Sequence, residues 1–368
     1  MFIFILTLMH KTRRQNILNY AKRRFGCNIV AAFNPENIFY LTGFWGEGIA
    51  ICNEEGETTL IAPKLEADRA SNTSKDCDIV PAERGSKLIS YFLSAVNNRK
   101  ICIDCIDYSI FRMVQQRLNS HQTLISNSQP FYETRMIKDE KEISSISKSA
   151  TILDKLYEIC MEKIREGLAE RELQAILIYE AMKMGASPPL YKWTLDPLII
   201  ASGPNGSYPH AQISDRKFKS GDMIVVDLTI RHEGYIADAT RTFGLGSISS
   251  DKRKVYDIVR KSQESGVKAV SEHVACEDID YICRQAIAQS GFAKFFVHAT
   301  GHGIGLEVHE PPWIRGKNQR KLKSNMSVTI EPGIYLQDRF GVRIEDSVIV
   351  RGGVKNLCQF TKELVVKG

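Results

Sequence analysis

Four acidic residues interrupt apolar, strand-like stretches in the second half of this 368-residue chain. Asp227 follows MIVV, Asp238 follows YIA, Glu331 follows VTI, and Glu345 stands between Ile344 and the stretch DSVIV. Burying a carboxylate without a compensating partner costs several kcal/mol. Any fold of this chain must therefore bring protons, cations or hydrogen-bond donors to these four side chains.

Two of the acids lie on a predicted β-hairpin, MIVVDLTIRHEGYIADATRTF (223–243). A tight turn at His232-Glu233 would place Asp227 opposite Asp238, with Cβ atoms about 4.5 to 5.5 Å apart. Two carboxylates at that separation repel each other unless a proton or a cation lies between them. Taken alone, the two residues are also compatible with ordinary aspartates of a loop or an edge strand.

Three of the eight histidines fall within HATGHGIGLEVHEPP (298–312). Its glycines and its two prolines oppose a helix, so we expect a strand–turn–strand that presents the imidazoles to one cavity. Divalent metal is the least costly compensation for four buried acids, and two ions about 3.5 to 4 Å apart would share such a set well. His302, fixed between Gly301 and Gly303, is the predicted nitrogen ligand.

Bulk composition indicates an ordinary soluble protein, with 43% apolar and 25% charged residues. The net charge of +6 is dispersed in small clusters, which favours a solvated surface and no nucleic-acid partner. The apolar opening Phe2–Met9 is followed, not preceded, by its basic residues, and it is far shorter than the roughly 20 residues that span a bilayer. We therefore expect a cytoplasmic protein without a membrane partner.

The nine cysteines have no regular spacing and mostly lie in apolar segments, which predicts reduced thiols that fill the core. Cys102 and Cys105 form a CxxC within the predicted strand KICIDCIDY. Because no second pair accompanies them, metal or redox chemistry is the less favoured interpretation there.

The first third of the chain alternates short helical and strand patterns and predicts an α/β unit. Its expected elements are a basic helix near Arg13–Arg24, strands at Cys27–Phe33, Cys77–Val80 and Lys100–Ile103, and a hairpin over residues 49–63 that turns at Asn53–Gly56.

A long amphipathic helix follows, with apolar residues spaced three and four apart from Ile143 to Ile164. The predicted domain boundary lies just before it, giving domains 1–132 and 133–368. The second domain is expected to be α+β, with a largely antiparallel sheet. Its further helices are predicted at Glu170–Met184, Asp251–Val274 and Asp278–Gln289, and its strands in 223–243, 327–336 and 341–350. His232 and His273 are expected on the surface, His232 in the turn and His273 in a helix.

These residues resemble the pita-bread-fold metallopeptidases, in the branch of Xaa-Pro dipeptidases (prolidases) and Xaa-Pro aminopeptidases. The resemblance covers almost the whole chain. It rests on NPENIFYLTGF (34–44), ASGPNGSYPHAQISDR (201–216), VVDLTIRHEGYIADATRTF (225–243), HATGHGIGLEVHEPP (298–312), TIEPGIY (329–335) and GVRIEDSVIV (341–350), in the family's order.

The resemblance implies a carboxy-terminal pita-bread domain with a curved, mostly antiparallel sheet and flanking helices. A smaller α/β domain of the creatinase/prolidase type would precede it and serve substrate gating and dimerisation. The implied activity is hydrolysis of the bond preceding proline in a dipeptide or short peptide, by a homodimer with two divalent ions. An oxygen-rich ligand set favours manganese or cobalt, with zinc or iron also possible.

Transferred by position, the five metal ligands fall on the residues chosen above, and the catalytic residues lie beside them. Asp238 and Glu345 would contact both ions, Asp227 one ion, and His302 and Glu331 the other. His309 would contact the scissile carbonyl, Glu331 would also shuttle a proton, and His210, His298 and Arg343 would complete the site, with Arg343 steadying the ligand carboxylates.

Three of these assignments have a simpler alternative. His298 could be a packed core imidazole, His210 a surface histidine of a proline-rich loop, and Arg343 half of a structural ion pair.

Two alternative functions remain open, an Xaa-Pro aminopeptidase and a non-catalytic binding protein. A dipeptidase needs a pocket closed behind the proline, whereas an aminopeptidase must leave that side open, and we lean towards the dipeptidase. A non-catalytic binding protein on the same fold is a further alternative, although such proteins typically lose metal ligands and this chain keeps all five. Methionine aminopeptidases are disfavoured because they usually lack so large an amino-terminal domain.

Overall fold

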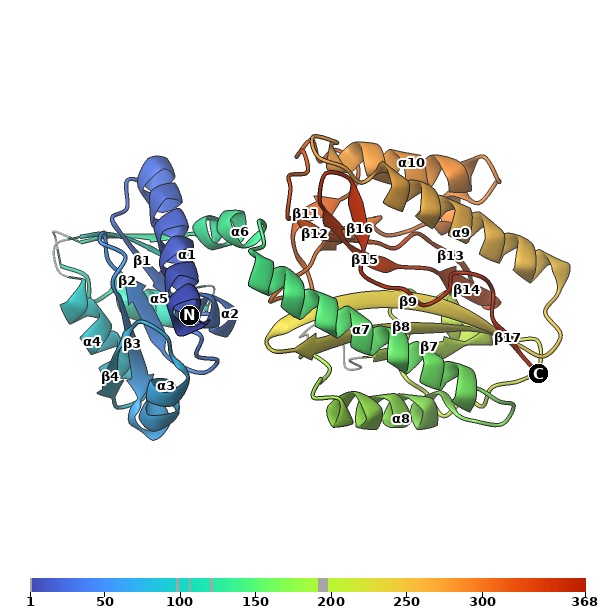
Figure 1. Cartoon of the computed structure of the whole chain (residues 1–368), viewed down its shortest axis with the longest axis horizontal. Helices are drawn as coiled ribbons and strands as arrows, with labels where there is room; N and C mark the ends of the chain where they lie inside the picture. The colour runs from blue at the N-terminus through green and yellow to red at the C-terminus, as the bar shows by residue number, and fades with distance from the viewer. Residues whose placement is uncertain (1, 97–98, 106, 120–121, 191–197) are drawn as a thin grey trace. The chain divides into compact units, whose positions relative to one another are not determined.

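A computed structural model describes residues 2–96, 99–105, 107–119, 122–190 and 198–368, with side chains from His10 onward. The chain divides into two compact units, Met1–Arg135 and Met136–Gly368 (Figure 1). Among the described residues, no helix combines the length and the apolar character needed to cross a membrane.

Unit 1 is built on a six-stranded mixed sheet with the order β4-β3-β2-β1-β5-β6. The strands are β1 (Ile29–Ala32), β2 (Ile49–Cys52), β3 (Thr58–Pro63), β4 (Asp78–Ala82), β5 (Lys100–Ile103) and β6 (Thr123–Ser126). The helices are α1 (Phe2–Phe25), α2 (Pro35–Thr42), α3 (Ala67–Thr73), α4 (Ser86–Ala95), α5 (Tyr108–Gln115) and α6 (Gln129–Arg135).

The elements expected for this unit are confirmed, including the β2–β3 hairpin. Its turn closes with a 3.0 Å hydrogen bond from the Gly56 amide to the Asn53 carbonyl. The strand predicted around the CxxC is too long, because β5 ends at Ile103 and Cys105 lies beyond it. All nine cysteines are free, and eight of them are buried, as expected for thiols that fill the core.

Unit 2 contains three further sheets. One has the order β17-β9-β8-β7, one the order β11-β10-β12-β15-β16, and the third pairs β13 with β14. The strands are β7 (Leu198–Ser202), β8 (Met223–His232), β9 (Tyr235–Leu245), β10 (Gly301–Gly303), β11 (Glu310–Ile314), β12 (Ser327–Ile330), β13 (Gly333–Leu336), β14 (Phe340–Arg343), β15 (Asp346–Val350), β16 (Val354–Asn356) and β17 (Val366–Lys367). Their pairing is antiparallel as predicted, except that β17 runs parallel to β9.

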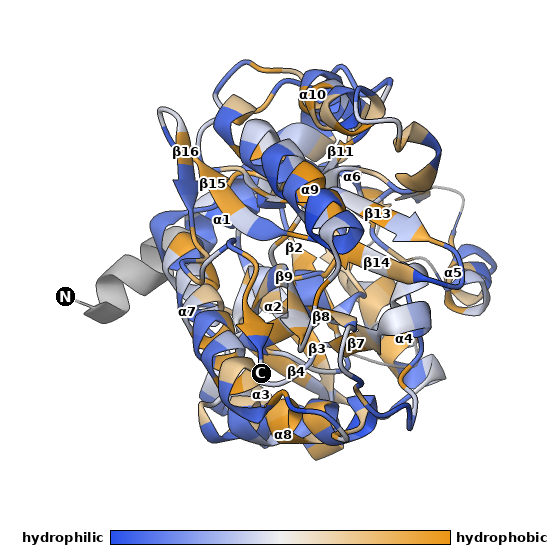
Figure 2. Ribbon diagram, turned by 90° about the vertical axis from the view of Figure 1, so that its right-hand side faces the viewer, coloured by the Kyte–Doolittle hydropathy of each residue, from blue (hydrophilic) through white to orange (hydrophobic). Residues whose placement is uncertain are grey.

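Two pairs of helices cover these sheets. Helices α7 (Glu140–Lys163) and α8 (Glu170–Lys183) pack on β7, β8 and β9, and α9 (Ser250–Ala269) and α10 (Cys276–Ala288) pack on the strands from the last third of the chain (Figure 1). Helix α7 begins with a capping box between Asp139 and Glu142, and its hydrophilic and hydrophobic residues alternate along the ribbon (Figure 2). The pita-bread architecture predicted for this part is confirmed.

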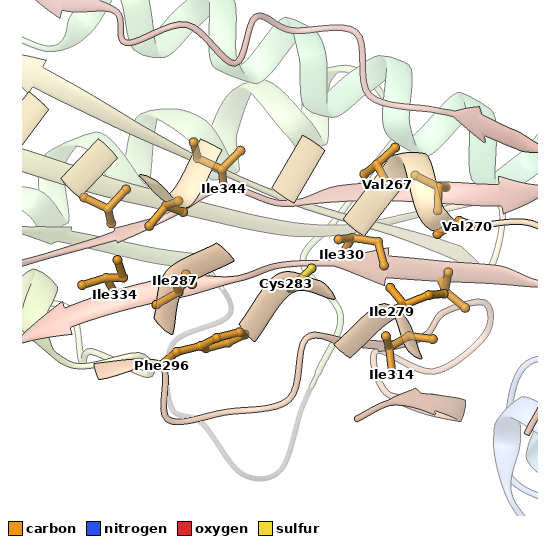
Figure 3. Packing of buried hydrophobic residues seen from close by; sticks show 14 of the residues in the cluster. Val267, Val270, Ile279, Cys283, Ile287, Phe296, Ile314, Ile330, Ile334 and Ile344 are labelled. Atoms are coloured by element: carbon orange, nitrogen blue, oxygen red, sulfur yellow. The ribbon is translucent and has the colours of Figure 1, made fainter. Parts of the chain in front are cut away.

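A large apolar cluster holds α9 and α10 against the strands (Figure 3). Val267 and Cys283 from the helices belong to the same cluster as Ile330 and Ile344. Each of these two isoleucines immediately precedes an acidic residue, Glu331 or Glu345. Because successive residues of an extended chain point to opposite sides, anchoring the isoleucines in the core turns the glutamates away from it.

The predicted register of the β8–β9 hairpin is wrong by two residues. The turn lies at Glu233-Gly234, so that His232 pairs with Tyr235 and partly buried His232 ends β8. Both turn residues have positive φ, 50° and 86°, which a two-residue hairpin turn matching the strand twist requires and which glycine adopts at no steric cost.

The corrected register makes the two aspartates diagonal neighbours. Asp227 pairs with Thr240, and Asp238 pairs with Thr229. A shift of two residues keeps both carboxylates on the face that was predicted, because side chains alternate with a period of two.

The helix predicted over 251–274 is too long. It ends at Ala269, where the extended backbone of Val270 (ψ 111°) stops the helical hydrogen bonding. His273 is exposed, as expected, but it lies in a turn with a φ of 70° and not in a helix.

Replacing Gly234 with alanine tests the hairpin turn. The variant forces an L-residue to keep a φ of 86°, so we expect the free energy of unfolding to fall by about 1 kcal/mol or more. Urea denaturation measures the change. Gly353→Ala is the matched control, because an added Cβ there meets nothing within 4 Å. Equal stability of the two variants would contradict the turn assignment.

Candidate metal centre

All nine predicted site residues line one pocket of unit 2. They are His210, Asp227, Asp238, His298, His302, His309, Glu331, Arg343 and Glu345. The rest of the described wall is mostly apolar and includes Ile199, Val308 and Trp313. The structure therefore brings together residues that lie up to 135 positions apart in the sequence, from His210 to Glu345.

Asp238, His302 and Glu345 form the tightest group in this pocket. One ligand atom of each lies within 4.8 Å of the others, and all three side chains are buried. Glu331 lies beside them, with Oε1 3.6 Å from Nε2 of His302. Asp227 is at the edge of the group, and its Oδ2 accepts a hydrogen bond from Arg343 Nη2.

The two glutamates occupy corners between sheets. Glu331 lies between β12 of the five-stranded sheet and β13 of the two-stranded sheet, and Glu345 lies where the chain returns from β14 to β15. The predicted strands 327–336 and 341–350 are therefore each broken in two. Pro332 marks the first break, because proline has no N–H to donate to a neighbouring strand.

Glu345 is held by the hairpin that carries the aspartates. Its backbone N–H donates to the Thr240 carbonyl at 3.0 Å, and Thr240 Oγ1 donates to its Oε2 at 2.8 Å. Its other oxygen, Oε1, is fully enclosed and accepts no hydrogen bond from the described residues. A buried acceptor without a donor is the position that a cation would satisfy, so the residues fit a divalent metal.

Three of the acids in the pocket have raised pKa values, as expected for carboxyl groups that are buried close together without a cation. Burial, with neighbouring Glu345 and Asp227, raises the pKa of Asp238 well above its usual value. Burial, together with Asp227, raises the pKa of Glu345 to about 8, and burial beside Glu345 raises that of Glu331. Without a cation these carboxyl groups hold protons at a pH where they would ordinarily be charged.

The histidines are held in the neutral form. Burial lowers the pKa of His302 and of His298 to about 3, and that of His309 to about 4. His302 Nδ1 lies 3.0 Å from the Gly303 carbonyl, which leaves Nε2 directed at the acids. A neutral imidazole with one nitrogen free towards carboxylates is the form that binds a metal.

The rings of His302 and His309 lie 4.2 Å apart between centroids. His298 is turned aside, with Nε2 2.9 Å from the hydroxyl of Tyr335. His210 also lines the pocket, and partial burial of its ring, followed by the charge of Arg343, lowers its pKa.

Sequence reasoning missed several residues that support the site. Tyr335 connects His298 to Arg343, whose Nη1 lies 2.6 Å from its hydroxyl, and Thr229 donates to Asp238 at 2.9 Å. Thr229 and Thr240 share the face of the aspartates at a spacing of two, and this pattern was visible in the sequence. Tyr335 gave no such signal, because its partners come from distant segments.

The stability of the metal-stripped protein should fall as pH rises from 6.5 to 8. The folded state keeps a proton on Glu345 up to a pKa of about 8, whereas the unfolded chain loses it near 4.5, so rising pH between these values favours unfolding. The histidines have the opposite effect, but only below their unfolded value of 6.5.

The measurement is the thermal midpoint in EDTA at pH 6.5 and 8, for the wild type and for Glu345→Gln. We expect the midpoint of the wild type to fall and that of the variant to fall less. Equal pH dependence in the two proteins would show that Glu345 does not carry a raised pKa.

Two family descriptions match the chain. Residues 144–352 match metallopeptidase family M24, and residues 13–137 match the creatinase/prolidase N-terminal domain. These matches confirm the family expected from the motifs, and the family implies divalent metal ions.

Relatives and solved structures agree along nearly the whole length. An Xaa-Pro dipeptidase of Pyrococcus horikoshii is 32% identical over 342 residues, covering 92% of this chain and 94% of the relative. A crystal structure of the prolidase from Pyrococcus horikoshii superposes with a TM-score of 0.88 at 30% identity, covering 96% of this chain and 100% of the other. An X-Pro aminopeptidase from Thermotoga maritima superposes with a TM-score of 0.85 at 30% identity, covering 96% and 99%. This chain thus belongs to metallopeptidase family M24 and is a hydrolase that joins an M24 catalytic domain to an amino-terminal domain of the creatinase/prolidase type.

Proposed function

We propose that this protein is an Xaa-Pro dipeptidase that hydrolyses the bond preceding proline with two divalent metal ions. The observation that carries the proposal is the convergence of Asp238, His302 and Glu345 within 4.8 Å in the pocket that also holds His210 and His309. The substrate class is supported by the 32% identical Xaa-Pro dipeptidase, which aligns with 92% of this chain.

The proposed ligands are the five predicted from the sequence. Asp238 and Glu345 would hold both ions, Asp227 one ion, and His302 and Glu331 the other. When bound, the ions would lower the pKa of a water molecule and so supply the nucleophile. Carboxylate oxygens with one imidazole favour manganese or cobalt over a structural zinc site, and zinc or iron would also fit.

The remaining residues have separate tasks around the scissile bond. His309 is neutral at physiological pH because burial lowers its pKa to about 4, so its N–H can donate to the oxygen of the attacked carbonyl as negative charge develops there. Glu331 would accept the proton of the attacking water and pass it to the leaving imino nitrogen. Arg343 would fix Asp227 through their hydrogen bond, and His210 and His298 would orient the substrate.

An Xaa-Pro aminopeptidase is the second candidate. The Thermotoga maritima X-Pro aminopeptidase structure fits this chain nearly as well as the Pyrococcus prolidase, with TM-scores of 0.85 and 0.88. The two activities differ in whether the side of the pocket behind the proline admits more residues.

A cytoplasmic homodimer is the proposed state of the protein, with unit 1 serving substrate gating and dimerisation. The support is the family resemblance of that unit. Light scattering of the purified protein decides it, since a mass of one chain, 41.6 kDa, would exclude the dimer.

Substrate length separates the candidates. Manganese-loaded protein is assayed on Ala-Pro and on Ala-Pro-Ala, and we expect hydrolysis of Ala-Pro alone. Cleavage of Ala-Pro-Ala would establish the aminopeptidase, and no cleavage of either would favour a binding protein on this fold.

Replacing Asp238 with asparagine should lower kcat/KM for Ala-Pro by more than about a hundredfold. Even the replacement of a residue that only hydrogen-bonds to a metal ligand lowers metal affinity or activity by up to about a hundredfold. Circular dichroism checks that the variant folds. Asp257→Asn is the matched control, since Asp257 lies on α9 with 55% of its side chain exposed, and it should keep full activity. Undiminished turnover by Asp238→Asn would refute the ligand assignment.

A further inference from the structure

A buried ion pair lies next to the histidines and has no task in the mechanism above. Lys138 Nζ donates to Glu310 Oε1 at 2.8 Å, and the two side chains are only 1% and 2% exposed. Taking both charges out of water is costly, and such a pair adds little stability compared with apolar side chains of similar volume. The pair therefore needs an explanation other than stability.

Lys138 belongs to the short segment between the boundary of the two units and helix α7. The segment is fixed from both sides. Lys138 N–H donates to the Asn325 carbonyl at 2.9 Å, Ile137 forms a β-bridge with Met326, and Asp139 caps α7. The ammonium group thus extends from a rigid backbone.

Glu310 is the first residue of β11 and directly follows His309. Holding Glu310 against Lys138 therefore fixes the backbone directly after His309, whose side chain lines the pocket. Glu310 also accepts a hydrogen bond from the Glu307 N–H at 3.4 Å, within the loop that connects His302 to His309.

The same loop is closed over the ion pair. A Cβ added at Gly305 would lie 2.7 Å from Glu310 Oε1 and 3.2 Å from Lys138 Cε, so the two side chains fill the space against the loop backbone. Gly305 itself accepts a hydrogen bond from the Ile236 N–H on β9. The carboxylate of Glu310 therefore contacts the loop at two points, the Glu307 N–H and the backbone around Gly305.

We propose that Lys138 and Glu310 are positioning residues that fix the loop 304–308, and with it the separation of the His302 and His309 rings. Neither residue is among the described residues that line the pocket. The proposal rests on the proposed function only in taking His302 as a metal ligand and His309 as a substrate contact.

A double replacement separates positioning from stability. Removing one partner takes away the buried counter-charge of the other, so Lys138→Met and Glu310→Met should each lower the thermal midpoint. Removing both leaves an apolar pair, and the double variant should recover a midpoint near that of the wild type. Glu310→Gln, which keeps the side-chain shape and an acceptor for Lys138, replaces the double variant if that protein does not fold.

Three quantities are measured on each variant: the thermal midpoint, the manganese dissociation constant by calorimetry, and kcat and KM for Ala-Pro. For the double variant we expect manganese affinity and kcat to fall by about tenfold to a hundredfold, the usual effect of removing an outer partner of a metal ligand. KM should change less than kcat, because the apolar wall of the pocket is untouched. A recovered midpoint with wild-type manganese affinity and kcat would overturn the proposal.

Arg14→Met is the matched control, because it removes a buried cation, 1% exposed and paired with Asp76, within unit 1. It should lower the midpoint and leave manganese affinity unchanged. If the wild type binds manganese but cleaves neither Ala-Pro nor Ala-Pro-Ala, the proposed activity fails, while manganese affinity of the double variant still decides the positioning role. A double variant with wild-type affinity would overturn that role in this case too.

Discussion

The burial of several carboxylates close to one another is the constraint on which the structure of the pocket in unit 2 depends. Asp238 and Glu345 are 5% and 2% exposed, and the charge of Glu345 raises the pKa of both Asp238 and Glu331. This close burial of carboxylates is unfavourable, but the apolar packing of the core determines where the strands lie and so keeps the acids together. Ile330 and Ile344 are fully buried in the cluster beneath α9 and α10, and the chain has no freedom to turn the following glutamates away from the pocket.

Short polar side chains orient the acids without neutralising them. Thr240 and Thr229 each donate one hydrogen bond, to Glu345 and Asp238. Only Asp227 has a direct cationic partner among the described residues of the pocket wall, Arg343, and Arg343 is itself shared with Tyr335 and Thr240. The site is therefore rigid in geometry and short of positive charge, which is the combination that a divalent cation completes.

Much of this could be predicted from the sequence, for identifiable reasons. The acids were found because they interrupt apolar strand patterns, and the α7 helix because its apolar spacing of three and four is regular over six turns. The hairpin register was missed because His232-Glu233 and Glu233-Gly234 are both plausible turns until the φ angles are known. The breaks at Glu331 and Glu345 were missed because periodicity shows strand character but not a change of sheet. Lys138 and Glu310 lie 172 positions apart, and nothing local in either segment indicates that they meet.

The proposed function depends most on cations being held among the five proposed ligands. Anomalous diffraction from a crystal grown with excess manganese measures this directly. We predict two peaks about 3.5 to 4 Å apart, with Asp238 and Glu345 contacting both. A well-ordered map without peaks among Asp227, Asp238, His302, Glu331 and Glu345, or with the carboxylates turned away from one another, would contradict it.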